Sequence, residues 1–306
     1  MMLLKDFISG SVGGLEFLYG HEEAKSVVFM LCEACLGTKS YTHIIEPGYE
    51  IPKEKQPFLD AAMKRLETGE PIQYVLGYAD FAGFRFKVDP AVLIPRPETE
   101  LLYRMSGEAV ARRMRMMAAY GRTGVKVLDL CTGSGCIAWS LALSYPGTKV
   151  VGVDISEAAL GIARGQDFGR TVKKSGASEP LFVQADVLSA SDDASLPDEI
   201  CRMGKFDVLV SNPPYVRESE KSLMRKNVCG FEPELALFVP DDDPLKFYRA
   251  IALWAGMVLA DGGSGFVEIN EAFGPQTARL FMDSGFLNVG TVKDFCGKNR
   301  FVRFTK

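Results

Sequence analysis

The chain has 306 residues, of which 47% are hydrophobic and 24% charged, and its formal net charge is −4. This is the composition of an ordinary globular protein, so collagen, coiled coil and extensive disorder are excluded, and the length predicts two domains. The acidic balance argues against a protein built mainly to neutralise a phosphate backbone. The N-terminus has no secretory pattern, and the longest apolar run, 251–260, is too short to span a bilayer. We expect a cytoplasmic monomer that binds no membrane and forms no stable complex with nucleic acid.

Residues 1–72 predict a small helical domain, because no strand-like alternation interrupts their helical periodicity. Gly69 followed by Pro71 ends its last long helix. No metal is expected, since the single Cys-x-x-Cys motif has no second pair and the chain contains only two histidines. Two buried faces are predicted, one formed by Val27, Val28, Leu31, Ala34 and Cys35 and one by Phe58, Ala62, Met63 and Leu66.

Residues 73–97 predict a β-hairpin that links two domains. The segment is rich in Tyr, Phe and Val, and apolar and charged residues alternate from Phe84 to Val88. A helix is expected to start at Pro97, which suits a first helical turn, and the acidic residues that follow suit the positive end of the helix dipole. We place the second domain at 98–306.

From Val125 onward, short apolar runs alternate with helical segments, which is typical of an α/β domain. Runs that are apolar on both faces indicate a parallel sheet covered by helices on both sides. The last two runs have no room for a helix between them, so we expect an antiparallel hairpin at the sheet edge. The expected strands lie in 125–130, 149–155, 180–186, 206–212, 265–270, 290–292 and 301–304. The predicted fold is a Rossmann-like, seven-stranded, mostly parallel sheet.

The first of these strands runs into a turn that contains two glycines. Glycines there let the backbone approach a ligand closely, and the start of the next helix offers unpaired N–H groups. Asp154 ends the next strand about 20 residues later and is placed to accept hydrogen bonds from ribose hydroxyls. The turn also fits the dinucleotide fingerprint G-x-G-x-x-A, so an NAD-dependent oxidoreductase stays open on this evidence. The expected cofactor-binding residues here are Cys131, Thr132, Gly133, Ser134, Gly135 and Asp154.

The third strand ends at Asp186 and Val187. Ligands of open parallel sheets lie outside the carboxyl ends of the strands. Asp186 can therefore accept a hydrogen bond from an adenine amino group while Val187 packs on the ring. The alternative is an ordinary solvated aspartate at a strand end.

The fourth strand ends in Asn212-Pro213-Pro214-Tyr215. Two prolines cannot continue a strand ladder. The Asn212 side-chain oxygen and the Pro213 carbonyl make two convergent acceptors, which suit the two N–H groups of a planar –NH2. We predict Asn212, Pro213 and Tyr215 as catalytic residues. All three are also expected to bind the substrate together with Pro214, and Asn212 is expected to contact the cofactor as well. A proline-stiffened surface turn is the alternative.

Taken together, these motifs resemble those of class I S-adenosylmethionine-dependent methyltransferases that act on a planar amide or an exocyclic amine. Further stretches resemble the HemK/PrmC family, the protein-(glutamine-N5) methyltransferases of peptide-chain release factors. Cys131 and Asn270 depart from the family pattern, since glycine is more usual at both positions. The first resemblance is carried by DLCTGSG (129–135), VDIS (153–156), QAD (184–186) and SNPPYV (211–216), and the second by GEPIQYVLG (69–77), LIPRPETE (93–100), FEPELAL (231–237) and DPLKFYRAI (243–251).

The resemblance implies S-adenosylmethionine as cofactor and methyl transfer to the glutamine of the Gly-Gly-Gln motif in class I release factors, which would be the protein partners. The helical domain at 1–72 would then dock the substrate. The segment 216–244 beside the site is either a lid or partner contact, or a solvated loop. A ribosomal-protein glutamine, an RNA exocyclic amine and the NAD-dependent oxidoreductase stay open as alternatives, although the last would need a proton relay that Asn-Pro-Pro-Tyr does not provide.

Overall fold

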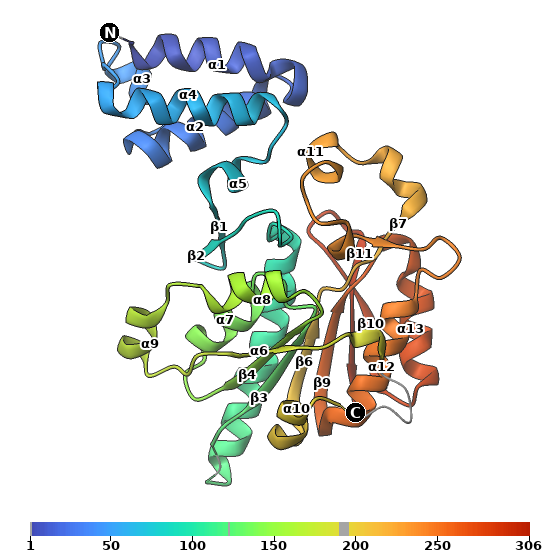
Figure 1. Cartoon of the computed structure of the whole chain (residues 1–306). Helices are drawn as coiled ribbons and strands as arrows, with labels where there is room; N and C mark the ends of the chain where they lie inside the picture. Colours follow the sequence, from blue (N-terminus) through green and yellow to red (C-terminus); the bar gives the residue numbers. More distant parts are fainter. Residues whose placement is uncertain (1, 122, 190–195) are drawn as a thin grey trace. The chain divides into compact units, whose positions relative to one another are not determined.

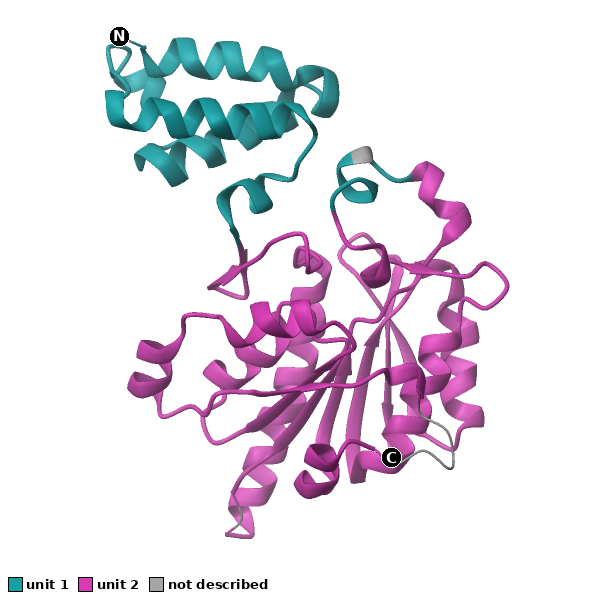
Figure 2. Cartoon of the chain, viewed as in Figure 1, with its two compact units in different colours: residues 1–78, 224–231 teal, residues 79–223, 232–306 magenta. Residues whose placement is uncertain are grey.

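The computed structural model describes residues 2–121, 123–189 and 196–306, apart from the side chain of residue 226. It forms two compact units (Figures 1 and 2). Unit 1 comprises 1–78 with 224–231, and unit 2 comprises 79–223 with 232–306. Each unit has its own hydrophobic core, and the site described below is built within unit 2 alone.

Unit 1 is helical, and each of its three long helices buries one apolar face. Its core confirms most of the two predicted faces, but Ala34 is exposed and Phe58 is 48% exposed. Leu59 is fully buried instead, because 59, 62, 63 and 66 have the i, i+3, i+4, i+7 spacing of a single helical face. The helices are α1 (Leu4–Tyr19), α2 (His21–Leu36), α3 (Thr42–Ile45), α4 (Gln56–Glu67), α5 (Ile72–Leu76) and α11 (Lys226–Cys229), with a 3-10 turn at Lys53–Lys55.

A two-stranded sheet follows α5, formed by β1 (Tyr78–Phe81) and β2 (Phe84–Lys87). The two residues between the strands, Ala82 and Gly83, both have positive φ, 51° and 80°. Two-residue turns of this kind match the twist of paired strands. The hairpin expected in 73–97 is therefore present, and it is short.

The main sheet of unit 2 has seven strands in the order β10-β11-β9-β6-β3-β4-β5, which confirms the predicted α/β fold. The neighbours from β9 to β5 run parallel, whereas β10 and β11 pair antiparallel with each other and β11 pairs antiparallel with β9. The strands are β3 (Lys126–Leu130), β4 (Lys149–Asp154), β5 (Leu181–Gln184), β6 (Phe206–Ser211), β9 (Leu259–Glu268), β10 (Leu287–Lys293) and β11 (Asn299–Thr305).

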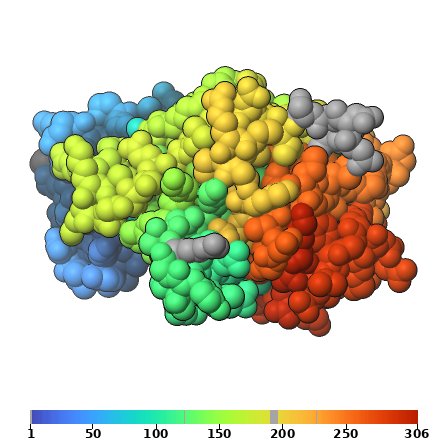
Figure 3. Space-filling model, turned by 90° about the horizontal axis from the view of Figure 1, so that it is seen from below, coloured from blue at the N-terminus to red at the C-terminus, as the bar shows by residue number. Residues whose placement is uncertain are grey.

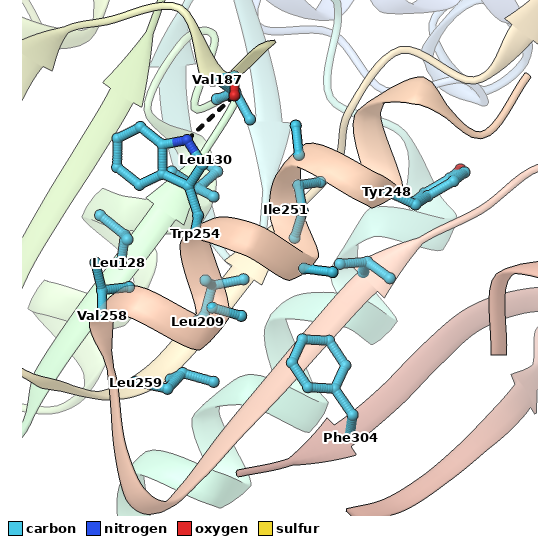
Figure 4. Packing of buried hydrophobic residues seen from close by; sticks show 14 of the residues in the cluster. Leu128, Leu130, Val187, Leu209, Tyr248, Ile251, Trp254, Val258, Leu259 and Phe304 are labelled. Carbon is cyan, nitrogen blue, oxygen red and sulfur yellow. Dashed lines mark hydrogen bonds between the residues drawn. The ribbon is translucent and has the colours of Figure 1, made fainter. Parts of the chain in front are cut away.

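Helices cover both faces of this sheet (Figure 1). Alternate residues of β3 enter different cores, Val127 on the side of α6 and α7, and Leu128 on the side of α12 and α13. Figure 4 shows the second core, in which the indole of Trp254 packs among aliphatic side chains. The helices are α6 (Pro97–Ala119), α7 (Cys136–Ser144), α8 (Glu157–Arg164), α9 (Gly169–Ser175), α10 (Asp198–Met203), α12 (Lys246–Val258) and α13 (Gly274–Asp283).

The segment 216–244 contains more regular structure than a loop. A second small sheet pairs β7 (Val216–Arg217) with β8 (Phe238–Val239), and 3-10 turns lie at Glu218–Leu223 and Glu234–Ala236. The part at 224–231 clusters with unit 1. Its predicted role as a lid or partner contact stays a prediction.

Candidate active site

A pocket lies at the carboxyl ends of β3, β4, β5 and β6, where the sequence predicts a ligand. Residues that follow each of these strands line it, together with residues from 91–99, 233–236 and the start of α12. Gly135, Pro213 and Tyr215 are the three predicted site residues that do not line it. The predicted residues that do are Cys131, Thr132, Gly133, Ser134, Asp154, Asp186, Val187, Asn212 and Pro214.

The turn after β3 uses positive φ at Cys131 (59°), Gly133 (54°) and Gly135 (76°). A Cβ on Gly133 would meet no atom within 4 Å, so the backbone there faces open space. A Cβ on Gly135 would lie 3.0 Å from Phe182 and 3.1 Å from Ala163. Gly133 thus presents backbone to the pocket, whereas Gly135 lets α7 pack closely on the sheet. Cys131 adopts a left-handed backbone conformation that favours glycine, so its side chain is held there at a cost in backbone strain.

Asp154 ties the glycine turn to the next strand. Its Oδ2 accepts a hydrogen bond from the Gly133 N–H at 2.8 Å, and its Oδ1 accepts one from the Ser156 N–H at 3.0 Å. Burial raises the pKa of this carboxyl, and the backbone N–H groups act in the opposite direction. Each carboxylate oxygen has a further lone pair, so the group can also accept from a ribose hydroxyl.

The corner formed by Asp186 and Val187 is fixed by two hydrogen bonds. Asp186 Oδ1 accepts from the Leu188 N–H at 2.8 Å, and the Val187 carbonyl accepts from the indole N–H of Trp254 at 3.1 Å (Figure 4). Val187 is 4% exposed and still borders the pocket. An apolar side chain and a carboxylate therefore sit side by side at this strand end, as the sequence predicts.

These residues fit a nucleoside cofactor. The open space before Gly133 would be filled by a Cβ, so only a bare backbone leaves room for a ligand there. The two carboxylates suit hydroxyl and amino groups, and Ile155, Val187 and Leu188 supply apolar surface for a base. The sequence analysis missed Ile155 and Leu188.

Asn212 follows β6 and has a fixed orientation. Its Nδ2 donates a hydrogen bond to Thr99 Oγ1, in the first turn of α6, at 3.2 Å. Within the described ranges, no protein donor reaches the Asn212 Oδ1 or the Pro213 carbonyl. Both oxygens thus keep their acceptor capacity, as the predicted role in gripping an –NH2 group requires.

Glu268, at the end of β9, is a site residue that the sequence analysis missed. It is 1% exposed and accepts hydrogen bonds from Thr99 Oγ1 and from the Tyr215 hydroxyl, both at 2.9 Å. Burial raises its pKa to about 7, although both hydrogen bonds and the nearby Arg300 lower it. A glutamate inside the apolar run Gly265–Asn270 was the available sequence signal, because charged residues are rarely buried without a partner.

Tyr215 faces this carboxylate with its hydroxyl and is absent from the pocket wall. Its backbone carbonyl accepts a hydrogen bond from Asn270 Nδ2 at 3.1 Å, and the same amide donates to Glu220 Oε2 at 3.0 Å. Asn270 Oδ1 accepts from the Ala272 N–H. Asn270 therefore holds together the segments that follow β6 and β9.

A salt bridge joins two further segments that line the pocket. Glu232 is 4% exposed, pairs with Arg96 at 2.6 Å and accepts a hydrogen bond from the Ile94 N–H at 3.1 Å. Pocket-lining residues Leu93 and Leu235 lie on the two joined segments.

Among the described residues, a separate groove is lined by three arginines of α6 and β11. It lies where the green end of α6 adjoins the red C-terminal segment, on the face seen from below (Figure 3).

The sheet order with its antiparallel edge strands, and the glycine-turn pocket at the carboxyl ends of the parallel strands, define a class I methyltransferase. A family model described as a methyltransferase domain matches residues 122–239, and one described as the PrmC N-terminal domain matches residues 14–77. The two models together cover more than half of the chain.

Full-length relatives point to one family. The release factor glutamine methyltransferase of Bacteroides thetaiotaomicron is 38% identical over 94% of this chain and 95% of its own length. That of Flavobacterium psychrophilum is 34% identical over 99% of each chain. A solved release-factor-specific protein-(glutamine-N5) methyltransferase from Alicyclobacillus acidocaldarius is 30% identical over 72% of this chain and 99% of that one, with a TM-score of 0.41. The chain belongs to the release factor glutamine methyltransferase family, and the family assignment rests on the sequence relatives and the family models.

It follows that the chain is an S-adenosylmethionine-dependent protein-glutamine N5 methyltransferase. The NAD-dependent oxidoreductase that the glycine turn left open is set aside. Across the described residues, the helices are too short or too polar to cross a membrane.

Proposed function

We propose that this enzyme transfers the methyl group of S-adenosylmethionine to the side-chain amide nitrogen of the glutamine in the Gly-Gly-Gln motif of class I peptide-chain release factors. Family membership supports the reaction and the protein substrate. The observation that carries the proposal is the orientation of Asn212, whose NH2 group is engaged by Thr99 while its oxygen keeps its acceptor capacity beside the cofactor pocket.

The chemistry requires help because an amide nitrogen is a poor nucleophile. Its lone pair is delocalised into the carbonyl, as in a peptide bond. The Asn212 Oδ1 and the Pro213 carbonyl accept one hydrogen bond each from the substrate –NH2, which orients the nitrogen and raises its electron density. S-adenosylmethionine supplies an electrophilic methyl group on a sulfonium.

The two acceptors also stabilise positive charge that develops on the nitrogen. Preorganised dipoles contribute most where water is excluded. Orientation of reacting groups can contribute roughly 7–11 kcal/mol at the upper end. The proton then leaves to water, so no general base is needed at this site.

The remaining predicted residues keep supporting roles in this proposal. Asp154 accepts from the ribose, Asp186 and Val187 hold the adenine, and Pro214 and Tyr215 shape the substrate side. Residues 1–72 dock the release factor. We further propose that the enzyme acts as a cytoplasmic monomer without a stable nucleic-acid complex. The cofactor's backbone contacts come from Cys131, Thr132, Gly133 and Ser134, with Gly135 closing the turn behind them.

The test is transfer of a labelled methyl group to a purified class I release factor, compared with the same factor carrying a changed Gly-Gly-Gln glutamine. We expect label only in the unchanged factor. Label in ribosomal protein or RNA, with none in the release factor, would instead favour the alternative substrates that the sequence left open.

Asn212→Ala tests the site itself. We expect turnover to fall by about 100-fold or more, the scale seen when one preorganised polar contact to a reacting centre is lost. Calorimetry should show S-adenosylmethionine binding within a few-fold of the parent enzyme. If binding is lost in proportion to activity, Asn212 belongs to the cofactor site and the positioning role is wrong.

A further inference from the structure

Glu268, Thr99 and Asn212 form a continuous hydrogen-bonded chain that ends at the proposed substrate contact. Thr99 Oγ1 donates to Glu268 Oε2 at 2.9 Å, and the same oxygen accepts from Asn212 Nδ2 at 3.2 Å. Glu268 and Thr99 are both buried, at 1% and 2% exposure, and Thr99 borders the pocket. The three residues come from the end of β9, the start of α6 and the end of β6.

The direction of each bond in this chain follows from counting protons. An ionised carboxylate can only accept, so the single hydroxyl proton of Thr99 must point to Glu268. Thr99 then has only lone pairs to offer to Asn212. Only the NH2 end of the Asn212 amide can donate a hydrogen bond to such a lone pair. The Asn212 Oδ1 therefore points away from Thr99.

The orientation of this amide decides whether the site works. The two ends of a carboxamide have nearly the same shape, so packing alone distinguishes them poorly. A rotation by half a turn would place the Asn212 NH2 against the substrate –NH2, with a donor facing a donor. An external hydrogen-bonding partner is therefore needed to choose the orientation.

We propose that Glu268 is a positioning residue that, through the Thr99 hydroxyl, holds the Asn212 oxygen toward the substrate amide. This inference rests on the proposed function and assigns two residues to it that do not touch the reacting atoms. The same carboxylate also accepts from the Tyr215 hydroxyl, so one buried charge sets both ends of the Asn-Pro-Pro-Tyr segment.

The surroundings of Glu268 make its charge state responsive to pH. Thr99 and Tyr215 donate to it, the Tyr248 hydroxyl donates to its backbone carbonyl, Arg300 favours the carboxylate and Glu98 opposes it. Burial is the largest influence and raises its pKa to about 7. A protonated Glu268 can donate to Thr99, whose own proton is then released to turn toward Asn212 and favour the wrong amide orientation. This relay, from Glu268 through the Thr99 hydroxyl to the Asn212 amide, should therefore weaken as the pH falls below about 7.

The first test replaces the hydroxyl and keeps the shape. For Thr99→Val we expect kcat to fall at least tenfold, with KM for the release factor and S-adenosylmethionine affinity changed less than threefold. Thr99→Ser, which restores a hydroxyl, should recover most of the lost kcat. Thr277→Val is the matched control, because Thr277 is fully buried and its hydroxyl has no partner among the described residues. That control should leave kcat unchanged.

The second test removes the ionisable group. In the parent enzyme, kcat should decline on the acidic side with a midpoint near pH 7, and Glu268→Gln should abolish this decline while lowering kcat at pH 8. A merely structural Glu268 would change thermal stability but leave the shape of the pH profile unchanged. That result, or a Thr99→Val enzyme with parental kcat, would overturn the proposal.

Failure of the inference and failure of the proposed function give different results. If Asn212→Ala abolishes transfer while Thr99→Val and Glu268→Gln do not, the acceptor role stands and only the relay is wrong. If Asn212→Ala retains full activity, the acceptor role itself fails.

Discussion

Gly133 and Gly135 share a left-handed backbone but face different surroundings. Both residues have positive φ, so an alanine at either position would suffer backbone strain of about 1 kcal/mol. A methyl group at Gly135 would also press on Phe182 and Ala163, whereas at Gly133 it would enter open space. The two glycines therefore allow packing and ligand binding to be separated experimentally.

We expect Gly135→Ala to lower the free energy of unfolding by roughly 2–4 kcal/mol, the sum of strain and overpacking. Gly133→Ala should cost about 1 kcal/mol in stability but weaken S-adenosylmethionine binding at least tenfold. Denaturant unfolding and calorimetry on both variants measure the two quantities. Equal loss of stability, with cofactor affinity intact in Gly133→Ala, would contradict the assignment of Gly133 to the pocket.

Residues in local motifs were predictable, and residues that act through distant partners were not. Asp154 is the last residue of one strand and Asn212 directly follows another, so strand end and residue type together indicate their position. Thr99 and Glu268 gain their role only from each other, across 169 residues of sequence. No local pattern encodes such a pair, and the orientation of the Asn212 amide depends on both of them.

The side chain of Asn270 attaches the segment that follows β6 to the end of β9. It bridges the Tyr215 carbonyl, Glu220 and the Ala272 N–H, and it is 7% exposed. Glu220 also accepts from the Arg217 N–H and guanidinium, and these contacts lower its pKa. The 3-10 turn after β7 is thereby attached to the end of β9.

For Asn270→Ala we expect a loss of roughly 1–3 kcal/mol in stability, since the Tyr215 carbonyl loses a buried donor. KM for the release factor should rise, because the segment beside the site is no longer anchored to β9. Gln276→Ala serves as a control, because Gln276 is an exposed amide side chain on α13. Unfolding curves and steady-state kinetics test both effects, and parental values for Asn270→Ala would show that the bridge is dispensable.

At the level of elements, strand positions were predicted better than strand lengths. β9 was expected at 265–270 and runs from Leu259 to Glu268. Its first half, with Gly262 and Gly263, has little intrinsic strand preference. Pairing supplies what propensity lacks, since Leu259 aligns with Phe206 of β6, and the backbone of Gly262 and Gly263 exchanges hydrogen bonds with that of Lys306. Phe58 was expected in the core because it is apolar. The buried face of α4 passes through Leu59 instead, so Phe58 lies outside that face.

Because unit 1 and unit 2 share no hydrophobic core among the described residues, we expect each unit to have its own free energy of unfolding. The core of unit 1 is drawn from residues 2–76, whereas the cofactor pocket belongs to unit 2. A ligand stabilises only the state that binds it, by RT ln(1 + [L]/Kd). S-adenosylmethionine should therefore raise the unfolding temperature of unit 2 and not that of unit 1.

Leu31→Ala and Leu209→Ala form a matched pair for this expectation, since both side chains are fully buried, one in each unit. Each should cost roughly 2–5 kcal/mol in its own unit. Calorimetric scans with and without S-adenosylmethionine should show the Leu31→Ala defect in the transition that the cofactor leaves unmoved, and cofactor affinity should stay parental. A single shared transition that shifts equally in both variants would argue against independent units.

The chain of contacts from Asn212 through Thr99 to Glu268 has a consequence for biosynthesis. A nascent polypeptide completed as far as β6 already carries the glycine turn, both pocket aspartates and the asparagine, yet lacks the carboxylate that aligns the amide. The ribosome therefore delivers the aligning carboxylate after the glycine turn, the aspartates and the asparagine. Alignment of the amide is therefore available only to a chain that has been translated through β9.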